Sequence, residues 1–185
     1  MKKYVAFIRA INVAGHASVR MSDLRDAFAA AGCQGVRTYI QSGNVIFESP
    51  EGNTAAVFQG VRVKLHDLLG HEPGVLLRTV RDVEGIVRGA PFKDFKSEPG
   101  IKLYVVFLSR KPQSKPRFPL LSSKEGLEAV AMKNLEVFIV SRRKKNGFYG
   151  FPNNFIEKEL GVSATSRNWS TVSKIAELVQ SEADG

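Results

Sequence analysis

The chain has 185 residues, of which 43% are hydrophobic and 24% charged, and its formal net charge at pH 7 is +9. This length suits one sizeable domain or two small lobes, and the composition is that of an ordinary globular protein. No stretch approaches the roughly 20 apolar residues that span a bilayer, so we expect a soluble, cytoplasmic protein without a membrane partner. A positive charge favours contact with nucleic acid or other anions, although a basic, solvated surface is the more common explanation of such a charge.

The cysteine and histidine content argues against disulfide and metal chemistry. Cys33 is the single cysteine, so no disulfide forms within the chain, and its place after a helical pattern is usual for a small buried thiol. The three histidines, at positions 16, 66 and 71, lack the spacing of metal ligands. We therefore expect no metal and no cofactor, and a reducing compartment.

The first half of the chain predicts elements in the order β-α-β-β-α-β. Ser22 can cap the first helix, and Gly32 and Gly70 suit the ends of the two helices. The simplest packing of this order is a ferredoxin-like α+β sandwich, predicted for residues 1–90, with two helices on one face of four strands. The expected elements are a strand at 3–9, a helix at 22–31, a hairpin of 36–41 and 45–48, a helix from 53 or 54 to 69, and a strand at 75–80.

The second half predicts a smaller α+β lobe at residues 91–185, which closes with helices. Residues 109–124 contain three prolines, which favour an irregular surface segment over a regular strand. A short helix is expected at 82–89, before this lobe begins. The elements expected in the lobe are a strand at 101–108, a hairpin of 127–132 and 135–140, and helices at 153–160 and 168–179.

Three sequence passages resemble the bacterial DUF1697 family of uncharacterised proteins. They read IRAINVAG at residues 8–15, TYIQSGNVIF at 38–47 and ATSRNWSTV at 164–172. With NNFIEKELG at 153–161, the resemblance spans nearly the whole chain. It departs from the family at Ala10 and Ala14, where glycine is usual, and at 149–152, where the family often carries a Ser-Lys pair. The resemblance implies a family fold but no activity.

Polar residues of these passages form a candidate ligand patch built from three segments, residues 9–15, 41–44 and 167–169. The candidate ligand-binding residues are Arg9, Asn12, Gly15, Gln41, Ser42, Asn44, Arg167 and Asn168. The planar guanidinium of Arg167 suits a carboxylate or phosphate, which makes it the preferred contact.

Each segment of this patch also has a structural interpretation. Gly43 and Asn44 are what a tight hairpin needs, and Asn12 can bond its own loop while Arg9 forms an ion pair. Trp169 shares a helical stripe with core positions, and Asn168 or Ser166 can cap that helix.

The run of Arg142, Arg143, Lys144 and Lys145 is a candidate nucleic-acid contact. Phe148, Tyr149 and Phe151 follow it and could stack on bases. The alternative is a solvated charge run beside core aromatics. No RNA-recognition strand motif is present.

These features support two functional hypotheses. The first is a binding module for a small anionic ligand or a nucleic-acid backbone, without chemistry. The alternative is an enzyme that acts on a small polar substrate without a metal, although no Ser-His-Asp, Cys-His or paired-carboxylate pattern identifies catalytic residues.

Overall fold

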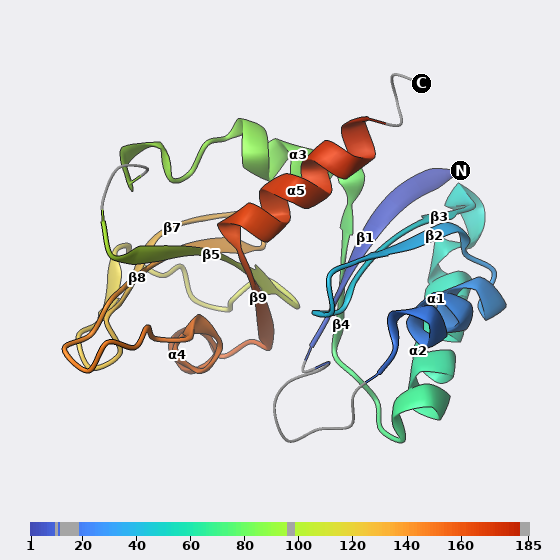
Figure 1. Ribbon diagram of the computed structural model, residues 1–185, viewed down its shortest axis with the longest axis horizontal. Helices are drawn as coiled ribbons and strands as arrows, with labels where there is room; N and C mark the ends of the chain where they lie inside the picture. Colours follow the sequence, from blue (N-terminus) through green and yellow to red (C-terminus); the bar gives the residue numbers. More distant parts are fainter. Residues whose placement is uncertain (10, 12–18, 96–98, 182–185) are drawn as a thin grey trace. The chain divides into compact units, whose positions relative to one another are not determined.

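The chain folds into two compact units, Met1–Val83 and Glu84–Gly185 (Figure 1). The structure is a computed structural model and describes residues 1–9, 11, 19–95 and 99–181. Over these residues it contains two antiparallel sheets and five α-helices, so the expected mixed α+β class is confirmed. The chain passes from one unit to the other within α3 (Val80–Arg88), and the predicted boundary between residues 90 and 91 lies just beyond that helix.

The first unit is a four-stranded sheet of order β2-β3-β1-β4 in which neighbouring strands are antiparallel. The predicted order of strands and helices along the chain is confirmed. A 3-10 turn at Glu51–Asn53 precedes the second helix. The elements are β1 (Lys2–Ile8), α1 (Met21–Ala30), β2 (Gln34–Tyr39), β3 (Asn44–Ser49), α2 (Thr54–Leu69) and β4 (Val75–Thr79).

Helices α1 and α2 cover one face of this sheet (Figure 1). Their buried residues recur every four positions, as an amphipathic helix requires: Leu24 and Phe28 in α1, and Val57, Val61 and Leu65 in α2. The sheet residues in the same core are Ala6, Ile8, Val45 and Phe47.

The ends of these helices test the predicted caps. Gly70 closes α2 in the left-handed conformation, with φ of 73°, as expected. The prediction that Ser22 caps α1 is wrong. The helix begins one residue earlier, at Met21, with Arg20 at the N-cap and no side-chain capping bond, and the Ser22 hydroxyl donates to Asp23 instead.

The second unit is a five-stranded sheet of order β6-β7-β8-β5-β9. The strand, hairpin and helices predicted from apolar periodicity are confirmed. Two strands were not predicted. β6 lies within residues 109–124, so the prediction that this whole segment is irregular is wrong at its end, after the last proline. β9 reads Ala-Thr-Ser-Arg-Asn, which lacks apolar alternation. The elements after α3 are β5 (Ile101–Leu108), β6 (Leu120–Ser122), β7 (Leu127–Lys133), β8 (Glu136–Arg142), α4 (Pro152–Leu160), β9 (Ala164–Asn168) and α5 (Trp169–Gln180), with a 3-10 turn at Lys93–Phe95.

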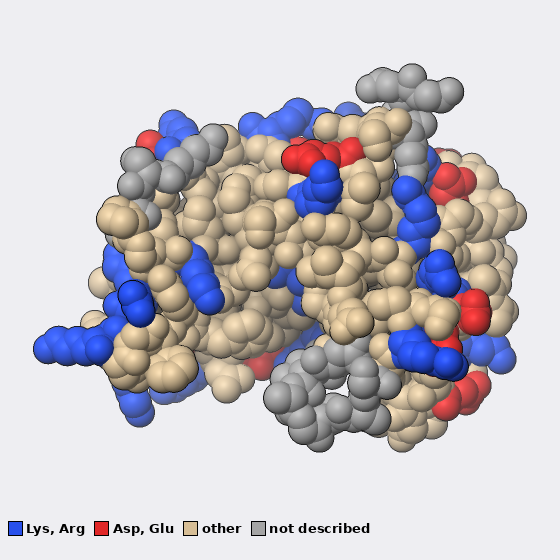
Figure 2. Space-filling model, in the orientation of Figure 1, with Lys and Arg blue, Asp and Glu red and all other residues tan. Residues whose placement is uncertain are grey.

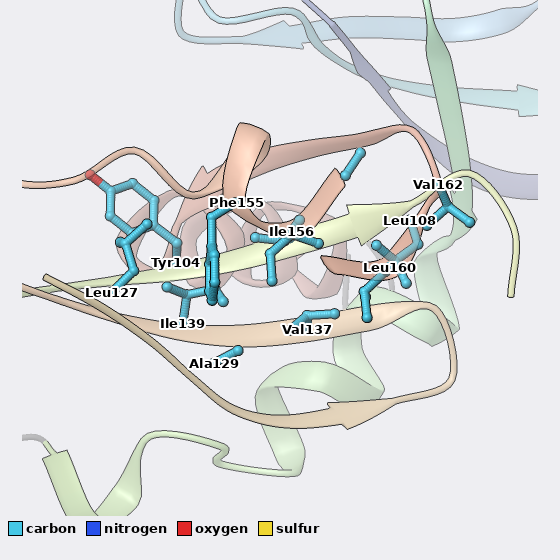
Figure 3. Packing of buried hydrophobic residues seen from close by; sticks show 12 residues of the cluster. Tyr104, Leu108, Leu127, Ala129, Val137, Ile139, Phe155, Ile156, Leu160 and Val162 are labelled. Carbon is cyan, nitrogen blue, oxygen red and sulfur yellow. The ribbon is translucent and has the colours of Figure 1, made fainter. Parts of the chain in front are cut away.

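Helices cover both faces of the second sheet. Figure 3 shows Phe155, Ile156 and Leu160 of α4 directed at the strand residues Val137 and Ile139. On the opposite face, α5 and the segment after α3 provide the cover (Figure 1), and the buried ring of Phe92 packs edge-on against Phe138 and Trp169. The contact of Trp169 with Phe92 agrees with its structural interpretation.

The helices among the described residues include none that is both long and apolar enough to cross a bilayer.

Candidate functional site

The hairpin turn is defined here as residues 40–43, between β2 and β3. Several of the residues predicted for a site in this region instead stabilise the turn itself. Gly43 has φ of 70°, and a Cβ there would lie 3.1 Å from the carbonyl oxygen of Ile8. The side chain of Asn44 is fully buried, and its Nδ2 donates to the carbonyl of Tyr39 at 3.0 Å and to Oγ of Ser42 at 2.8 Å. These contacts support the structural interpretation of Gly43 and Asn44.

The tip of the hairpin turn is exposed. Ile40 leaves 49% of its surface accessible and adopts φ of 49°, a conformation that is costly for a β-branched residue. Gln41 is exposed beside it, and Ser42 is half-buried. The polar groups that the turn presents outward therefore belong to Gln41 and in part to Ser42.

Arg9 follows β1 and is half-buried. Its backbone N–H donates to the carbonyl of Gly74 at 2.8 Å, and a Cβ on Gly74 would fall 2.7 Å from Arg9 Cδ. The aliphatic stem of Arg9 thus packs along a position that has no side chain. Asn12 and Gly15, the other candidates of this segment, lie outside the described residues.

Arg167 lies in β9, where it pairs with Val105, and it is buried, with a relative exposure of 7%. Its Nη1 donates to Oγ1 of Thr165 at 2.9 Å and to the carbonyl oxygen of Ser166 at 2.8 Å. Burial lowers the pKa of Arg167 to about 10, so the guanidinium still carries its charge at neutral pH. It is a desolvated cation, not an exposed contact.

The two neighbours of Arg167 in the sequence differ from each other in burial, since Ser166 is buried and Asn168 is exposed. Ser166 points to the opposite face of β9, together with its partner Val106, and its buried Oγ has no hydrogen-bond partner among the described residues. Asn168 is exposed at the N-cap of α5 and makes no side-chain capping bond, so the prediction that Asn168 or Ser166 caps this helix is wrong. Arg9 and Gln41 belong to the first unit and Arg167 to the second, so the single three-segment patch stays a prediction.

The basic-aromatic turn, defined here as residues 142–151 after β8, is held by its backbone. Lys144 N–H donates to the carbonyl of Phe148 at 2.9 Å, and Gly147 N–H donates back to the carbonyl of Lys144 at 2.9 Å. Ser141 Oγ donates to the carbonyl of Gly150 at 3.0 Å, and this glycine is so close to the carbonyl of Glu125 that a Cβ would overlap it. The turn therefore has a fixed path.

The cations of the basic-aromatic turn are not equivalent. Arg142 Nη1 forms an ion pair with Glu128 Oε2 at 2.5 Å, which offsets its charge. Arg143 is exposed, and its Nε donates to the carbonyl of Gly147 at 3.2 Å, which helps to close the turn. Lys145 is exposed and Lys144 is half-buried. Figure 2 shows Lys and Arg side chains gathered over this end of β8, at the left of the view.

The aromatic residues of this turn are largely on the surface. Phe148 is 70% exposed and Phe151 60%, although Phe151 makes an edge contact with Tyr104 at 6.1 Å between ring centroids. Lys102 Nζ lies over the ring of Tyr149, 4.5 Å from its centroid. The alternative of core aromatics is therefore wrong for Phe148 and Phe151.

The second unit adds two residues that the sequence did not single out. Lys102 and Tyr104 come from β5, about 40 positions before the turn, and only strand pairing brings them to it. A weak signal exists in the sequence, since Lys102 interrupts an otherwise apolar strand.

Thiol and metal chemistry find little support in the described part of the chain. Burial raises the pKa of Cys33 to about 11, so its thiol stays protonated and is a poor nucleophile at neutral pH. Among the residues that the structure describes, no group of three or more His, Cys, Asp or Glu side chains is placed to hold a metal ion.

Comparison with known proteins identifies a family but no activity. A family model described as "Protein of unknown function (DUF1697)" matches residues 1–138. The solved structure of the conserved bacterial protein SP0830 from Streptococcus pneumoniae is similar in fold, with a TM-score of 0.62 and 19% sequence identity over 95% of this chain and 97% of its own. No curated protein matches the sequence. Since the family model covers well over half of its residues, the chain belongs to the DUF1697 family of proteins of unknown function.

Proposed function

We propose that this chain is a non-catalytic binding module for an anionic ligand, and that its main ligand is the phosphate backbone of a nucleic acid. The observation that carries the proposal is the basic-aromatic turn, which has four basic residues and no acidic residue in ten positions and presents exposed rings among them. Cations concentrated on a fixed surface release counterions when they neutralise phosphates, which is the main source of sequence-independent affinity for nucleic acids.

Within the turn, Lys144 and Lys145 are the most suitable phosphate contacts. Arg142 already neutralises Glu128, and Arg143 contributes to the closure of the turn. The stem of Lys144 lies 3.4 Å from the position of a Cβ on Gly126, which fixes the start of the side chain near the surface of the sheet. An ammonium group on a flexible stem suits a phosphate as a point charge.

A salt titration with a fluorescent oligonucleotide tests the proposal. The logarithm of the association constant should fall linearly with the logarithm of salt concentration, with a slope of about −0.7 for each phosphate that is neutralised on a single strand. The double variant Lys144→Ala, Lys145→Ala should bind more weakly at low salt and show a slope smaller in magnitude by about 1.4, which is about 0.7 for each lysine.

The matched control is Lys64→Ala, which removes an exposed lysine from α2 in the first unit. It should change the affinity and the slope far less than removal of one lysine from the turn. The proposal fails if neither oligonucleotides nor nucleotides bind at low salt, where counterion release favours binding most.

A small anion at Arg167 is the second candidate ligand, and it corresponds to the predicted ligand patch. The burial that lowers the pKa of this guanidinium makes contact with a carboxylate or phosphate more favourable than it would be in water. A thermal-shift series with phosphate, nucleotides and dicarboxylates should then raise the melting temperature of the wild type more than that of Arg167→Lys. Equal shifts in both proteins would exclude Arg167 as the contact.

We also propose that the first unit is a ferredoxin-like sandwich and that the protein works in the cytoplasm. The strand order β2-β3-β1-β4, with antiparallel neighbours and two helices on one face, supports the fold assignment. The single buried cysteine supports a reducing compartment.

A further inference from the structure

We propose that the basic-aromatic turn is a stacking platform for single-stranded nucleic acid, in which Phe148 and Phe151 receive bases while neighbouring cations contact the phosphates. This inference rests on the proposed function and makes it specific, since it names the strand state of the ligand and the side chains that read it.

The exposure of the two rings is the first step of the argument. Phe148 leaves 70% of its surface accessible and Phe151 60%, within four positions of each other. A folded chain ordinarily buries phenylalanine, and two exposed rings in one turn indicate an interaction surface. A base has an aromatic face of its own and gains from stacking on such a ring whatever its sequence.

The second step is that the backbone carrying Phe148 is fixed, and the ring of Phe151 is packed, before a ligand arrives. Phe148 is joined to the turn at both its carbonyl, which accepts from Lys144 N–H, and its N–H, which donates to Asn146 Oδ1 at 3.1 Å. Phe151 rests edge-on against Tyr104 at 6.1 Å. A surface that is already ordered loses little conformational entropy on binding.

The third step is charge complementarity, which favours a phosphate-bearing ligand on this surface. Arg143, Lys144 and Lys145 lie within the turn, and Lys102 adds a fourth cation against the ring of Tyr149 at 4.5 Å. Glu128 of β7 lies beside the turn, and its carboxylate is paired with Arg142. Cations beside exposed rings suit the phosphates and the bases of a strand.

A single strand fits this surface better than a duplex or a membrane. The bases of a duplex are stacked on one another, so their faces are not accessible to Phe148 or Phe151. A membrane-surface segment is ordinarily an amphipathic helix with a long apolar face, whereas this turn is not helical and presents two exposed phenylalanines beside several cations.

Fluorescence anisotropy with a labelled oligothymidylate and a duplex of the same length provides the test. The wild type should bind the single strand more tightly than the duplex. Phe148→Ala should weaken binding of the single strand about ten-fold and leave duplex binding and the salt slope unchanged.

Two further variants separate stacking from general apolar contact. Phe148→Tyr keeps an aromatic face and should retain the wild-type affinity, whereas Phe148→Leu keeps apolar area without that face and should resemble Phe148→Ala. Because the side chain is exposed, all three variants should show the wild-type melting curve.

The possible failures are distinguishable. If the single strand and the duplex bind equally and Phe148→Ala binds like the wild type, stacking is wrong while the proposed function stands. Binding of anionic lipid vesicles that depends on Phe148, without binding of oligonucleotide, assigns the surface to a membrane and overturns both.

Discussion

The two units each present a tight turn rich in polar and glycine residues, and the two turns differ in what their side chains do. In the hairpin turn of the first unit, Asn44 is buried, and its side-chain amide donates hydrogen bonds to Tyr39 and Ser42. In the basic-aromatic turn of the second unit, backbone bonds and glycines carry most of the closure, which leaves Phe148 and Lys145 exposed. When the polar side chains of a motif form hydrogen bonds within their own turn, few of their donors and acceptors remain to bind a ligand.

The largest effect on stability is expected from substitution of Gly150, the buried glycine of the basic-aromatic turn. Gly150→Ala would place a Cβ into the carbonyl oxygen of Glu125 and 3.0 Å from Leu127 Cγ, so the turn must shift. We expect a loss of about 2–3 kcal/mol in the free energy of unfolding, measured with urea. The control is Gly85→Ala in α3, whose Cβ meets no described atom within 4 Å and which should not destabilise the chain. Equal effects in both variants would mean that the close approach of Gly150 is not structural.

The second prediction compares one asparagine from each turn. Asn44→Ala removes a fully buried amide and leaves the partly buried carbonyl of Tyr39 without this donor, and we expect a loss of about 1–3 kcal/mol. Asn146→Ala removes an exposed bond to Phe148 N–H, which water can replace, and should cost about 0.5 kcal/mol. Urea unfolding of both variants decides between them, and a larger loss for Asn146 would reverse the proposed difference between the turns.

The third prediction concerns Cys33 and pH. Burial raises the pKa of its thiol to about 11 from the ordinary 9.0, so the unfolded chain releases this proton at lower pH than the folded one. Stability therefore holds below about pH 9 and falls as the pH rises toward about 11. The free energy of unfolding should be measured for the wild type and Cys33→Ala between about pH 9 and about pH 11. The difference between the two proteins should shrink as the pH rises, because other groups that titrate there affect both proteins alike. A constant difference would contradict burial of the thiol. Alkylation at pH 8 should be slow until urea unfolds the chain.

The smallest effect on stability is expected from Glu128→Gln. The ion pair with Arg142 is partly exposed, so its loss should cost less than about 1 kcal/mol. The variant nevertheless adds one uncompensated positive charge beside the basic-aromatic turn. Oligonucleotide affinity should rise at low salt and return to the wild-type value at high salt. Weaker binding would show that the carboxylate positions Arg142 for the ligand.

Much of the fold could be predicted from local sequence. The four-residue spacing of Val57, Val61 and Leu65 and the φ-tolerant Gly70 predict α2 together with its end, and the apolar run of β5 predicts a strand. Strand β9 could not be predicted in this way, because its polar residues become a buried strand only through pairing with β5. The candidate site was affected by the same limit: Arg167 was selected for its chemistry, yet it is desolvated by residues distant in sequence.

The hairpin turn of the first unit and the basic-aromatic turn of the second show which properties follow from local sequence and which depend on the tertiary structure. The sequence by itself determined the helices, most strands, the turn at Gly43 and the sequence of cations followed by rings. Only the tertiary structure decided that Asn44 faces inward, that Arg167 is buried, and that Phe148 and Phe151 remain exposed beside Lys102. The physical reason is that backbone conformation follows from neighbours in the chain, whereas burial, and with it the availability of a charge or ring, depends on partners that folding brings from elsewhere.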